Sequence, residues 1–429
     1  MENQITKVKA REVLDSRGNP TVEVEVWSGS KMGRAIAPSG ASTGIHEALE
    51  LRDCNPKRFN GKGVLHAVEN VNSIIAKTIT GLDCTRQDQI DTTMIVLDGT
   101  PNKAKLGANA TVATSMAVAK CAAACKNLPL YKSLNTPANL LPVPMLNVLN
   151  GGKHAGTKLS PQEFMIMPVG ANNFHEALRM AAEIYHILGT IVKERYGVSA
   201  KNIGDEGGYA PNMEMTSEAL DCLMTAIEKA GYQKEVLIAI DPAASSFYDE
   251  KLKTYYIDGK HLTSGQLVDF WVEITKKFPI VSIEDPFQEE DFESFAALTS
   301  KIGSHIQVVG DDLFVTNVKR IKIGVEKHSA NSVLIKLNQI GTITETVQAI
   351  ELALQNGWTA VVSHRSGETD DATIADFVVG MGTGQIKTGA PARGERVSKY
   401  NQLLRIEDEL IDNAKYAGKD FHFKPDRGN

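Results

Sequence analysis

The feature that most constrains the fold of this chain is a series of short apolar runs, each of which ends in charged or polar residues. Successive ends lie roughly 23 to 43 residues apart, about the length that a strand, a helix and two loops require. The segments between the runs look helical, as in TITETVQAIELALQNG. The runs are VLIAIDP, which ends at Asp241; IVSIEDP, at Glu284; IQVVGDD, at Asp311; SVLIKLN, which carries Lys336; TAVVSHRSG, at His364 and Arg365; and GQIKTG, which carries Lys387.

Continuous apolar runs predict strands that are buried on both faces, and therefore a parallel sheet. Repeated βα units with polar residues at the carboxyl end of each strand predict an α/β fold, a (β/α)8 TIM-type barrel whose active site lies at that end. A doubly wound open sheet is the alternative, and it would place a glycine-rich turn after its first strand. The sequence has no G-x-G-x-x-G that opens a helix and no P-loop, and GMGTGQIKTG has the glycines without the spacing.

The first third of the chain has strands first and helices afterwards, which predicts a small α+β domain. TVEVEVW, residues 21–27, alternates valine with glutamate or threonine and predicts a half-buried antiparallel strand. Helices are predicted for IHEALELRD (45–53), GVLHAVENVNSIIAKTI (63–79) and the alanine-rich run 108–125.

A length of 429 residues exceeds the usual size of one domain, so two domains are expected. NTPANLLPVPM, residues 135–145, is rich in proline and predicts the linker. We therefore expect an N-terminal domain at 1–134 and a barrel domain at 146–429.

Composition excludes several classes of function. The net charge is −6, which argues against a broad nucleic-acid surface or an anionic-membrane surface but leaves room for a local basic pocket. The N-terminal segment is too charged for a signal peptide, and the apolar run 108–125 reads as a packed core helix rather than a membrane span. The five cysteines are odd in number and lack C-x-x-C spacing, so we expect a reducing, cytosolic compartment, with Cys121 and Cys125 as small core residues.

The polar ends of the strands would converge on one pocket of the barrel. Taken singly, an aspartate at a strand end is most often a helix cap or a loop residue. Together, Asp241, Glu284 and Asp311 would repel one another, and three hard oxygen ligands suit Mg²⁺. Cationic Lys336, Arg365 and Lys387 would bind a small substrate that carries phosphate and carboxylate groups. The buried Lys336 must be paired or reactive, and beside a divalent ion its pKa would fall enough for it to act as a base.

Two further stretches are candidates for the site. GDEGGYAP sets Asp205 and Glu206 between glycines, where one of two repelling carboxyl groups can keep its proton and act as a general acid. A polar surface turn is the alternative interpretation. APSGASTGIHEA, residues 37–48, is a small-residue loop that leads into the helix expected at 45–53, and it is either a plain connection or a mobile lid over an anion or metal.

These residues lie within a sequence that resembles the enolase family nearly from end to end. The most specific string is LIKLNQIGTITET, because the wider superfamily shares the barrel but not this string. The resemblance implies a barrel with modified first units, capped by the N-terminal α+β domain. It implies a hydro-lyase, phosphopyruvate hydratase, which reversibly dehydrates 2-phosphoglycerate to phosphoenolpyruvate with two Mg²⁺ per site. The other matching segments are DSRGNPTVEVEV, PSGASTG, EALELRD, LNGGKHAG, QEFMIMPVGA, GDEGGYAP, SIEDPF, VGDDLFVTN, SHRSGETDD and GQIKTGAPARGERVSKYNQLLRIE.

The resemblance also implies a role for each matching residue. Lys336 corresponds to the base that removes the C2 proton, and Glu206 to the acid that protonates the leaving C3 hydroxyl. Asp241, Glu284 and Asp311 correspond to ligands of the first Mg²⁺, and Ser42 to a ligand of the second. The phosphate and carboxylate contacts correspond to Arg365, Ser366 and Lys387, and the remaining polar groups that line the pocket to His154, Gln162, Glu163 and His364.

The sequence departs from the family pattern at two places. Ser246 stands where the family usually has glutamate, within DPAASSF, and Gly394 stands in GAPARGER where GAPCRSER is commoner. Two alternatives remain at this point: a racemase or lactonising enzyme of the same superfamily, which the cationic groups disfavour, and a catalytically silent structural or surface-binding protein on the same fold. The silent protein should have lost Glu206, Lys336 or a metal carboxylate, and all are present.

The resemblance further implies a homo-oligomer, a dimer or an octamer, that acts in glycolysis and gluconeogenesis in the cytoplasm, with secondary display at the cell surface. Family members bind plasminogen through a C-terminal lysine, and this sequence ends in DRGN, so we do not expect that mode of binding. We expect no nucleic-acid or membrane partner.

Overall fold

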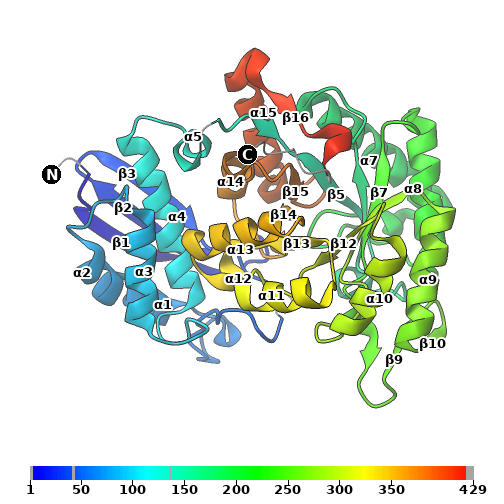
Figure 1. Cartoon of the computed structure of the whole chain (residues 1–429), viewed down its shortest axis with the longest axis horizontal. Helices are drawn as coiled ribbons and strands as arrows, with labels where there is room; N and C mark the ends of the chain where they lie inside the picture. The colour runs from blue at the N-terminus through cyan, green and yellow to red at the C-terminus, as the bar shows by residue number, and fades with distance from the viewer. Residues whose placement is uncertain (1–2, 41–43, 136, 422–429) are drawn as a thin grey trace.

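The computed structural model describes residues 3–40, 44–135 and 137–421, except for the side chains of residues 153 and 154. An N-terminal part of three strands and several helices lies beside a larger barrel (Figure 1). The closed barrel confirms the predicted fold class and rules out the open doubly wound sheet.

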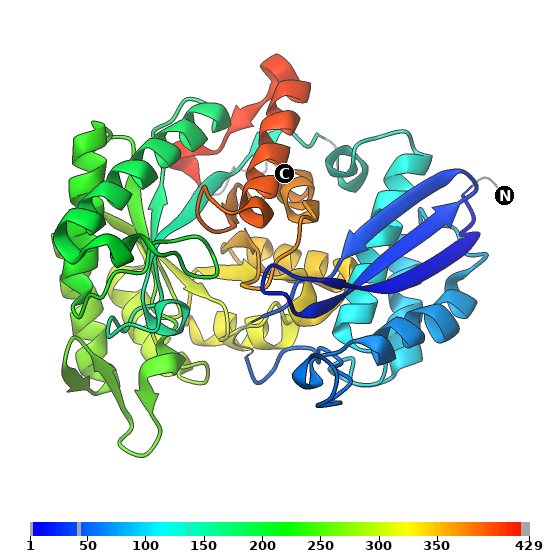
Figure 2. The same ribbon diagram turned by 180° about the vertical axis from the view of Figure 1, so that it is seen from behind.

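The N-terminal part is an antiparallel sheet with helices on one side (Figure 2). The long helix α4 (Ala108–Cys125) packs against strand β3 so closely that a Cβ added at Gly33 would lie 2.1 Å from the Ala117 carbonyl oxygen. Helices were predicted correctly at 63–79 and 108–125. The elements are β1 (Lys7–Leu14), β2 (Pro20–Ser28), β3 (Lys31–Ile36), η1 (Phe59–Gly61), α1 (Leu65–Glu69), the π-helical η2 (Asn70–Ile75), α2 (Ala76–Ile79), α3 (Gln87–Asp98), α4 and α5 (Leu130–Leu134).

Strand β2 is antiparallel as predicted, but it is not half-buried. Glu23 and Glu25 on its polar face are buried. Arg11 and Arg34 from the neighbouring strands reach over this face, with nitrogens 2.6 and 2.5 Å from Glu25 oxygens. The alternating pattern therefore identifies the strand correctly, and the ion pairs cover the side that alternation alone would leave to solvent.

The segment 45–53 is not the helix that we predicted. Its backbone instead pairs with other parts of the chain: the Ala48 N–H donates to the Gln339 carbonyl at 2.8 Å, and the Leu49 N–H donates to the Asn102 carbonyl at 2.7 Å. These tertiary contacts satisfy the donors that a helix would otherwise have satisfied. As a result the segment makes a turn at 45–47 and then runs without regular structure against helix α12 (Leu337–Ile340), at the junction with the barrel.

The barrel contains one reversed strand. Its eight strands close in the order β11-β12-β13-β14-β15-β5-β6-β7, and β6 pairs antiparallel with both of its neighbours while the remaining pairs are parallel. This agrees with the expectation of modified first units. The strands are β5 (Val143–Asn150), β6 (Glu163–Met167), β7 (Leu237–Asp241), β11 (Ile280–Glu284), β12 (Gln307–Gly310), β13 (Ser332–Ile335), β14 (Thr359–Ser363) and β15 (Gln385–Lys387).

The helices of the barrel alternate with its strands from α7 onward, and two small sheets complete the fold. Strand β5 begins at Val143, so residues 143–145 of the expected linker belong to the barrel. The remaining elements are β4 (Leu140–Leu141), α6 (Gly152–Ala155), α7 (Phe174–Tyr196), η3 (Val198–Lys201), α8 (Thr216–Ala230), η4 (Ala244–Phe247), β8 (Tyr248–Asp249), β9 (Thr254–Ile257), β10 (Lys260–Leu262), α9 (Ser264–Lys277), α10 (Phe292–Ile302), α11 (Val318–Lys327), α12 (Leu337–Ile340), α13 (Ile343–Gln355), α14 (Thr373–Met381), α15 (Gly394–Leu410), η5 (Ile411–Asn413), β16 (Lys415–Tyr416) and η6 (Gly418–Asp420).

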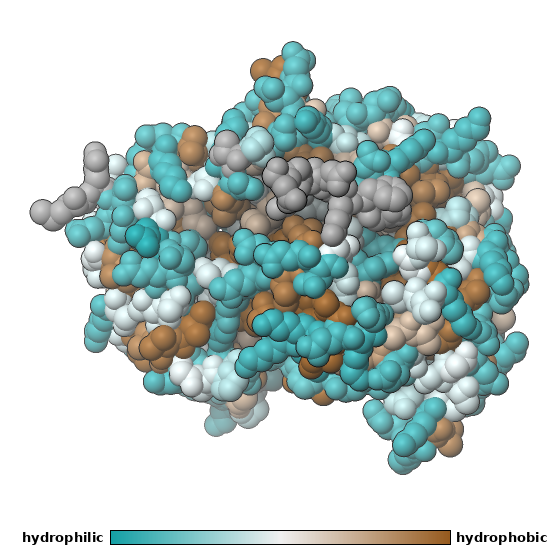
Figure 3. Space-filling model, in the orientation of Figure 1, coloured by the Kyte–Doolittle hydropathy of each residue, from teal (hydrophilic) through white to brown (hydrophobic). Residues whose placement is uncertain are grey.

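Hydrophilic side chains cover most of the face of the molecule seen in Figure 3, and hydrophobic side chains show between them in smaller groups. Within the described ranges, none of the helices is both long and apolar enough to cross a membrane. Helix α4 is buried along nearly its whole length inside the protein, which explains its apolar composition.

Candidate active site at the mouth of the barrel

The polar residues predicted at the strand ends meet at one end of the barrel, which we call the mouth. The carboxyl ends of the parallel strands point to this end, and the reversed strand β6 presents its first residue there, because Glu163 pairs with Asp241 at the end of β7. A cavity at the mouth is lined by Gln162, Glu163, Glu206, Asp241, Ala243, Asp285, Asp311, Asp312, Lys336, Ser363, His364, Arg365, Ser366 and Lys387.

Lys387 ties three carboxylates together. Its Nζ lies 2.8 Å from an Asp241 oxygen, 2.9 Å from both oxygens of Glu284 and 3.2 Å from Glu163. Burial alone would lower the pKa of Lys387, but the surrounding carboxylates raise it well above its ordinary value. Glu284 does not line the cavity, yet it is held in the same cluster, where burial and then repulsion from Asp241 raise its pKa.

Lys336 follows β13 and is paired with Asp311, which follows β12. The Gln339 side-chain amide donates to the other Asp311 oxygen at 2.9 Å. Burial lowers the pKa of Lys336, but attraction to the nearby carboxylates, Asp311 first and then Glu284, together gives a net upward shift. The protein's own groups therefore raise the pKa of Lys336, whereas a divalent ion nearby would be expected to lower it.

Arg365 is buried and links the mouth to the N-terminal part. Its guanidinium donates to both carboxylate oxygens of Glu47, at 2.8 and 3.1 Å, and to the Asn338 side-chain oxygen at 3.0 Å. Glu47 lies in the segment 45–53 that we predicted as a helix. The turn at 45–47 and the backbone contact of Ala48 with Gln339 bring Glu47 to the barrel, and sequence reasoning did not single it out.

Glu206 and His364 lie side by side on the same cavity. His364 Nε2 is 3.3 Å from a Glu206 oxygen, and the Asn147 amide donates to that oxygen at 3.1 Å. Arg396 approaches His364 Nδ1 at 2.6 Å. Because arginine can only donate, Nδ1 must accept, which leaves the imidazole proton on Nε2, facing Glu206. Burial lowers the pKa of His364 to about 4, so the ring is neutral at pH 7.

Two carboxylates that sequence reasoning missed stand beside the predicted ligands. Asp285 accepts hydrogen bonds from the backbone N–H groups of Asp311 and Asp312, at 2.8 Å each. Burial and repulsion from Asp312 raise the pKa of Asp285, and burial and repulsion from Asp311 raise the pKa of Asp312 to about 7. The doubled acids in SIEDP and VGDD were the available signal.

The donor set at the mouth fits a divalent metal ion. Asp241, Glu284 and Asp311 are buried, and they supply the hard carboxylate oxygens that such ions prefer. Their charges repel one another, as the raised pKa of Glu284 shows, so a bound cation would relieve a real cost. One carboxylate oxygen each from Asp285, Asp311 and Asp312 also lie within 4.8 Å of one another.

The other predicted residues are not all placed. Ser42 lies outside the described part of the chain, together with residues 41 and 43 of the expected lid at 37–48, and so does the side chain of His154. Ser246, in η4, is partly buried and does not line the cavity, so its departure from the family pattern leaves the described ligands intact. Gly394 begins α15, and a Cβ added there would meet only open space.

Comparisons with known proteins match both parts of the chain. Residues 5–134 match the family model described as the N-terminal domain of enolase, and residues 138–424 match the model described as the enolase C-terminal TIM barrel domain. The enolase of Methanocaldococcus jannaschii is 59% identical over 97% of this chain and 98% of its own length. The enolases of Thermococcus gammatolerans and Methanosarcina barkeri are each 58% identical, over 98% and 97% of this chain and 99% and 97% of their own lengths.

The two family models together span nearly the whole chain, and so do the relatives. Asp241, Asp311, Lys336, Arg365 and Lys387 line one cavity. Members of the matched family act on a small molecule with a divalent metal ion. The chain belongs to the enolase family.

Proposed function

We propose that the mouth of the barrel catalyses the reversible, Mg²⁺-dependent dehydration of 2-phosphoglycerate to phosphoenolpyruvate and water. As a member of the enolase family the chain is a lyase, a phosphopyruvate hydratase. The observation that carries the assignment of roles is the contrast between two buried lysines in one cavity. Lys387 is surrounded by carboxylates, whereas Lys336 depends on Asp311.

Asp241, Glu284 and Asp311 would hold the first Mg²⁺, and Ser42 would contribute to a second. Bound there, the ions would supply positive charge beside the substrate carboxylate, where negative charge develops as the C2 proton leaves.

Lys336 is the proposed base, and its Nζ takes the C2 proton of 2-phosphoglycerate. A base must be neutral, but Asp311 favours the charged form of Lys336. Lys336 therefore becomes an effective base only when Asp311 is engaged elsewhere, as the proposed role of Asp311 as a metal ligand requires. The pairing of Lys336 with Asp311 thus links the competence of the base to the state of the metal site.

Glu206 is the proposed acid, which gives its proton to the leaving C3 hydroxyl so that water departs. Neutral His364 and Asn147 hold the Glu206 carboxyl group in place. Because the two roles fall on different side chains, proton removal and water loss can be interrupted separately.

Arg365, Ser366 and Lys387 would bind the phosphate and carboxylate groups, and Gln162, Glu163, His154 and His364 would complete the polar lining. Arg365 is well prepared for this role because Glu47 and Asn338 fix the plane of its guanidinium before substrate arrives.

Separate measurement of proton exchange and product formation tests these roles. Glu206→Gln should still exchange the C2 proton of 2-phosphoglycerate with deuterium from solvent while making little phosphoenolpyruvate. Lys336→Ala should do neither. Lys251→Ala, an exposed lysine outside the mouth, is the matched control and should do both. If the Glu206 and Lys336 variants lose proton exchange equally, the assigned roles of acid and base are wrong. If Lys336→Ala exchanges the C2 proton as fast as the parent, Lys336 is not the base.

We further propose that the protein forms a homo-oligomer and acts in glycolysis and gluconeogenesis in the cytoplasm, with a domain boundary near residues 135–145. Sedimentation analysis of the purified chain would test the oligomeric state. Nothing observed at the mouth favours a catalytically silent protein.

A further inference from the structure

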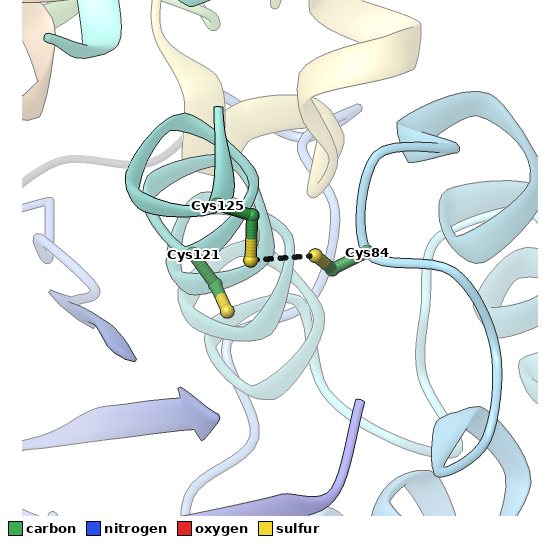
Figure 4. Close-up of side chains that lie close together, drawn as sticks. All are labelled: Cys84, Cys121 and Cys125. Atoms are coloured by element: carbon green, nitrogen blue, oxygen red, sulfur yellow. Dashed lines mark hydrogen bonds between the residues drawn. The ribbon is translucent and has the colours of Figure 1, made fainter. Parts of the chain in front are cut away.

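Three cysteines from two parts of the N-terminal half, one in a turn and two on a helix, meet at one point, far along the chain from the residues of the mouth (Figure 4). One sulfur each from Cys84, Cys121 and Cys125 lie within 4.8 Å of one another. The sulfurs of Cys84 and Cys125, 41 positions apart in sequence, are 3.7 Å apart. The chain has five cysteines, so this cluster gathers most of its thiols.

The fold brings these thiols together through well-fixed backbone. Cys121 and Cys125 are four residues apart on α4, so they project from the same face of the helix. Cys84 lies in the turn between α2 and α3, and its N–H donates to the Asn3 carbonyl at 2.9 Å. Gly33 packs closely against the α4 backbone at Ala117 and Cys121, which fixes the helix against the sheet.

Packing alone accounts for part of this arrangement, because cysteine is often a small buried residue. It accounts less well for the contact among three thiols. Cys84 and Cys121 are fully buried, but Cys125 is partly exposed, so one member of the cluster lies near the surface. Cys121 is therefore a buried core residue as predicted, whereas Cys125 is only partly buried.

We propose that Cys84, Cys121 and Cys125 form a binding site for a thiophilic divalent metal ion of the Zn²⁺ class, separate from the mouth of the barrel. Tetrahedral Zn²⁺ with zinc–sulfur bonds of about 2.3 Å places its sulfur ligands about 3.8 Å apart. The separation of Cys84 and Cys125 already matches this value. A water molecule beside Cys125 would be the fourth ligand.

Binding would replace three S–H bonds by three metal–sulfur bonds and release three protons to the solvent, with no change of oxidation state. In the protein alone, contact with Cys121 and burial raise the pKa of Cys84, and burial raises that of Cys125. Thiols held in the protonated form react slowly with oxidants and disulfides, which require the thiolate. Metal binding must displace the same protons, so the preference for an ion rests on the spacing of the three sulfurs.

A bound ion would join the turn at Cys84 to α4 and so stabilise the N-terminal sheet and its helices. Thiolate ligands also distinguish this site from the carboxylates of the mouth, which prefer harder ions. The two sites can therefore be observed independently in the same protein.

Cobalt is a suitable probe, because Co²⁺ bound to thiolates gives an intense charge-transfer band that Co²⁺ bound to carboxylates lacks. The purified chain would be stripped of metal, kept reduced with a phosphine and titrated with Co²⁺ in the presence of excess Mg²⁺, which would occupy the mouth. We expect the band to reach its plateau at one ion per chain and to disappear when Zn²⁺ is added. We expect Cys125→Ser to weaken the band and to lower Zn²⁺ affinity. Loss of a residue that only hydrogen-bonds to a metal ligand lowers affinity about 10- to 100-fold, so loss of a ligand should cost at least as much.

The partly exposed position of Cys125 makes this variant safe for folding, and unchanged turnover of 2-phosphoglycerate would show that it is folded. Cys222→Ala removes a buried thiol of α8 outside the cluster and is the matched control, which should keep the full band. Absence of the band in the parent, or an equal band in Cys125→Ser, would overturn the proposal. So would a peptide map of the zinc-treated protein in which Cys84 is joined to Cys125 by a disulfide.

Discussion

The two lysines of the mouth carry the same charge but stand in different surroundings. Lys387 contacts Asp241, Glu284 and Glu163, and its side chain is 3% exposed. Lys336 is paired with Asp311 and is 14% exposed. Attraction to carboxylates raises the pKa of both lysines, and the larger group of carboxylates raises that of Lys387 further above the ordinary value.

This difference in surroundings suits the two lysines to different roles, one to balancing buried charge and the other to proton transfer. A lysine held by several carboxylates cannot give up its proton without leaving several buried charges uncompensated, so Lys387 suits charge balance and the binding of an anion. A lysine that depends on one carboxylate changes its protonation state when that carboxylate changes partner. Lys336 is therefore the better candidate for proton transfer.

Removal of divalent ions should give the largest effect, because the carboxylates beside both lysines would serve one metal centre. We expect a chelator to reduce turnover of 2-phosphoglycerate to background, and added Mg²⁺ to restore it. Na⁺ at matched ionic strength is the control and should restore nothing. Undiminished turnover in the metal-stripped protein would show that the two groups of carboxylates do not share an ion.

Replacing each lysine by methionine should next separate their contributions to stability. Lys387→Met leaves Asp241, Glu284 and Glu163 without their common partner, and loss of one member of a buried ion pair costs about 3–5 kcal/mol. Lys336→Met should cost clearly less, because Asp311 keeps its bond from Gln339. The midpoints of urea unfolding, measured without metal, compare the two variants. Equal losses of stability would remove the distinction between the lysines.

The charged strand ends could be predicted from the sequence because each follows a short apolar run. Asp241, Glu284, Asp311, Lys336 and Lys387 all lie at, or directly after, the carboxyl end of a barrel strand. The alternation of strands and helices places these ends on one face without any knowledge of side-chain contacts.

Positions that depend on tertiary contacts could not be predicted in this way. Glu163 opens a strand, and only the reversal of β6 brings it to the mouth; the family resemblance, not the apolar pattern, pointed to it. Glu47 lies in a segment with helical composition whose backbone bonds are made to distant residues. Asp285 was overlooked because its role is to accept backbone hydrogen bonds beside predicted ligands.

Glu47 offers a test of whether the N-terminal part contributes to the mouth. Glu47→Gln removes the charge that faces Arg365 but keeps a hydrogen-bond acceptor, and a hydrogen bond to a charged group is worth about 1.5 to 3 kcal/mol. We expect a corresponding loss in kcat/KM, about 10- to 100-fold, expressed mainly as a higher KM for 2-phosphoglycerate. Glu194→Gln, an exposed carboxylate of α7 away from the mouth, is the control. An unchanged KM would mean that Arg365 is oriented by the barrel alone.

Replacement of His364 should have the smallest effect on stability at neutral pH. This prediction extends the comparison from the two lysines to a side chain that is buried without charge. Its folded pKa of about 4 lies below the ordinary value of 6.5, so the unfolded chain binds the proton more readily between these values. Stability from this residue is therefore present above pH 6.5 and is lost as the pH falls toward 4. At pH 5 the loss is about 2 kcal/mol.

In His364→Gln the amide oxygen can still accept from Arg396, but no group titrates at this position. The urea midpoint of the variant should therefore fall less than that of the parent between pH 7 and pH 5, and the difference between the two proteins isolates His364 from the carboxylates that they share. His186→Gln, an exposed histidine of α7, should follow the parent. If parent and His364→Gln lose stability in parallel, the imidazole is already protonated in the folded protein, and its contact with Glu206 is an ion pair rather than the neutral one deduced from Arg396.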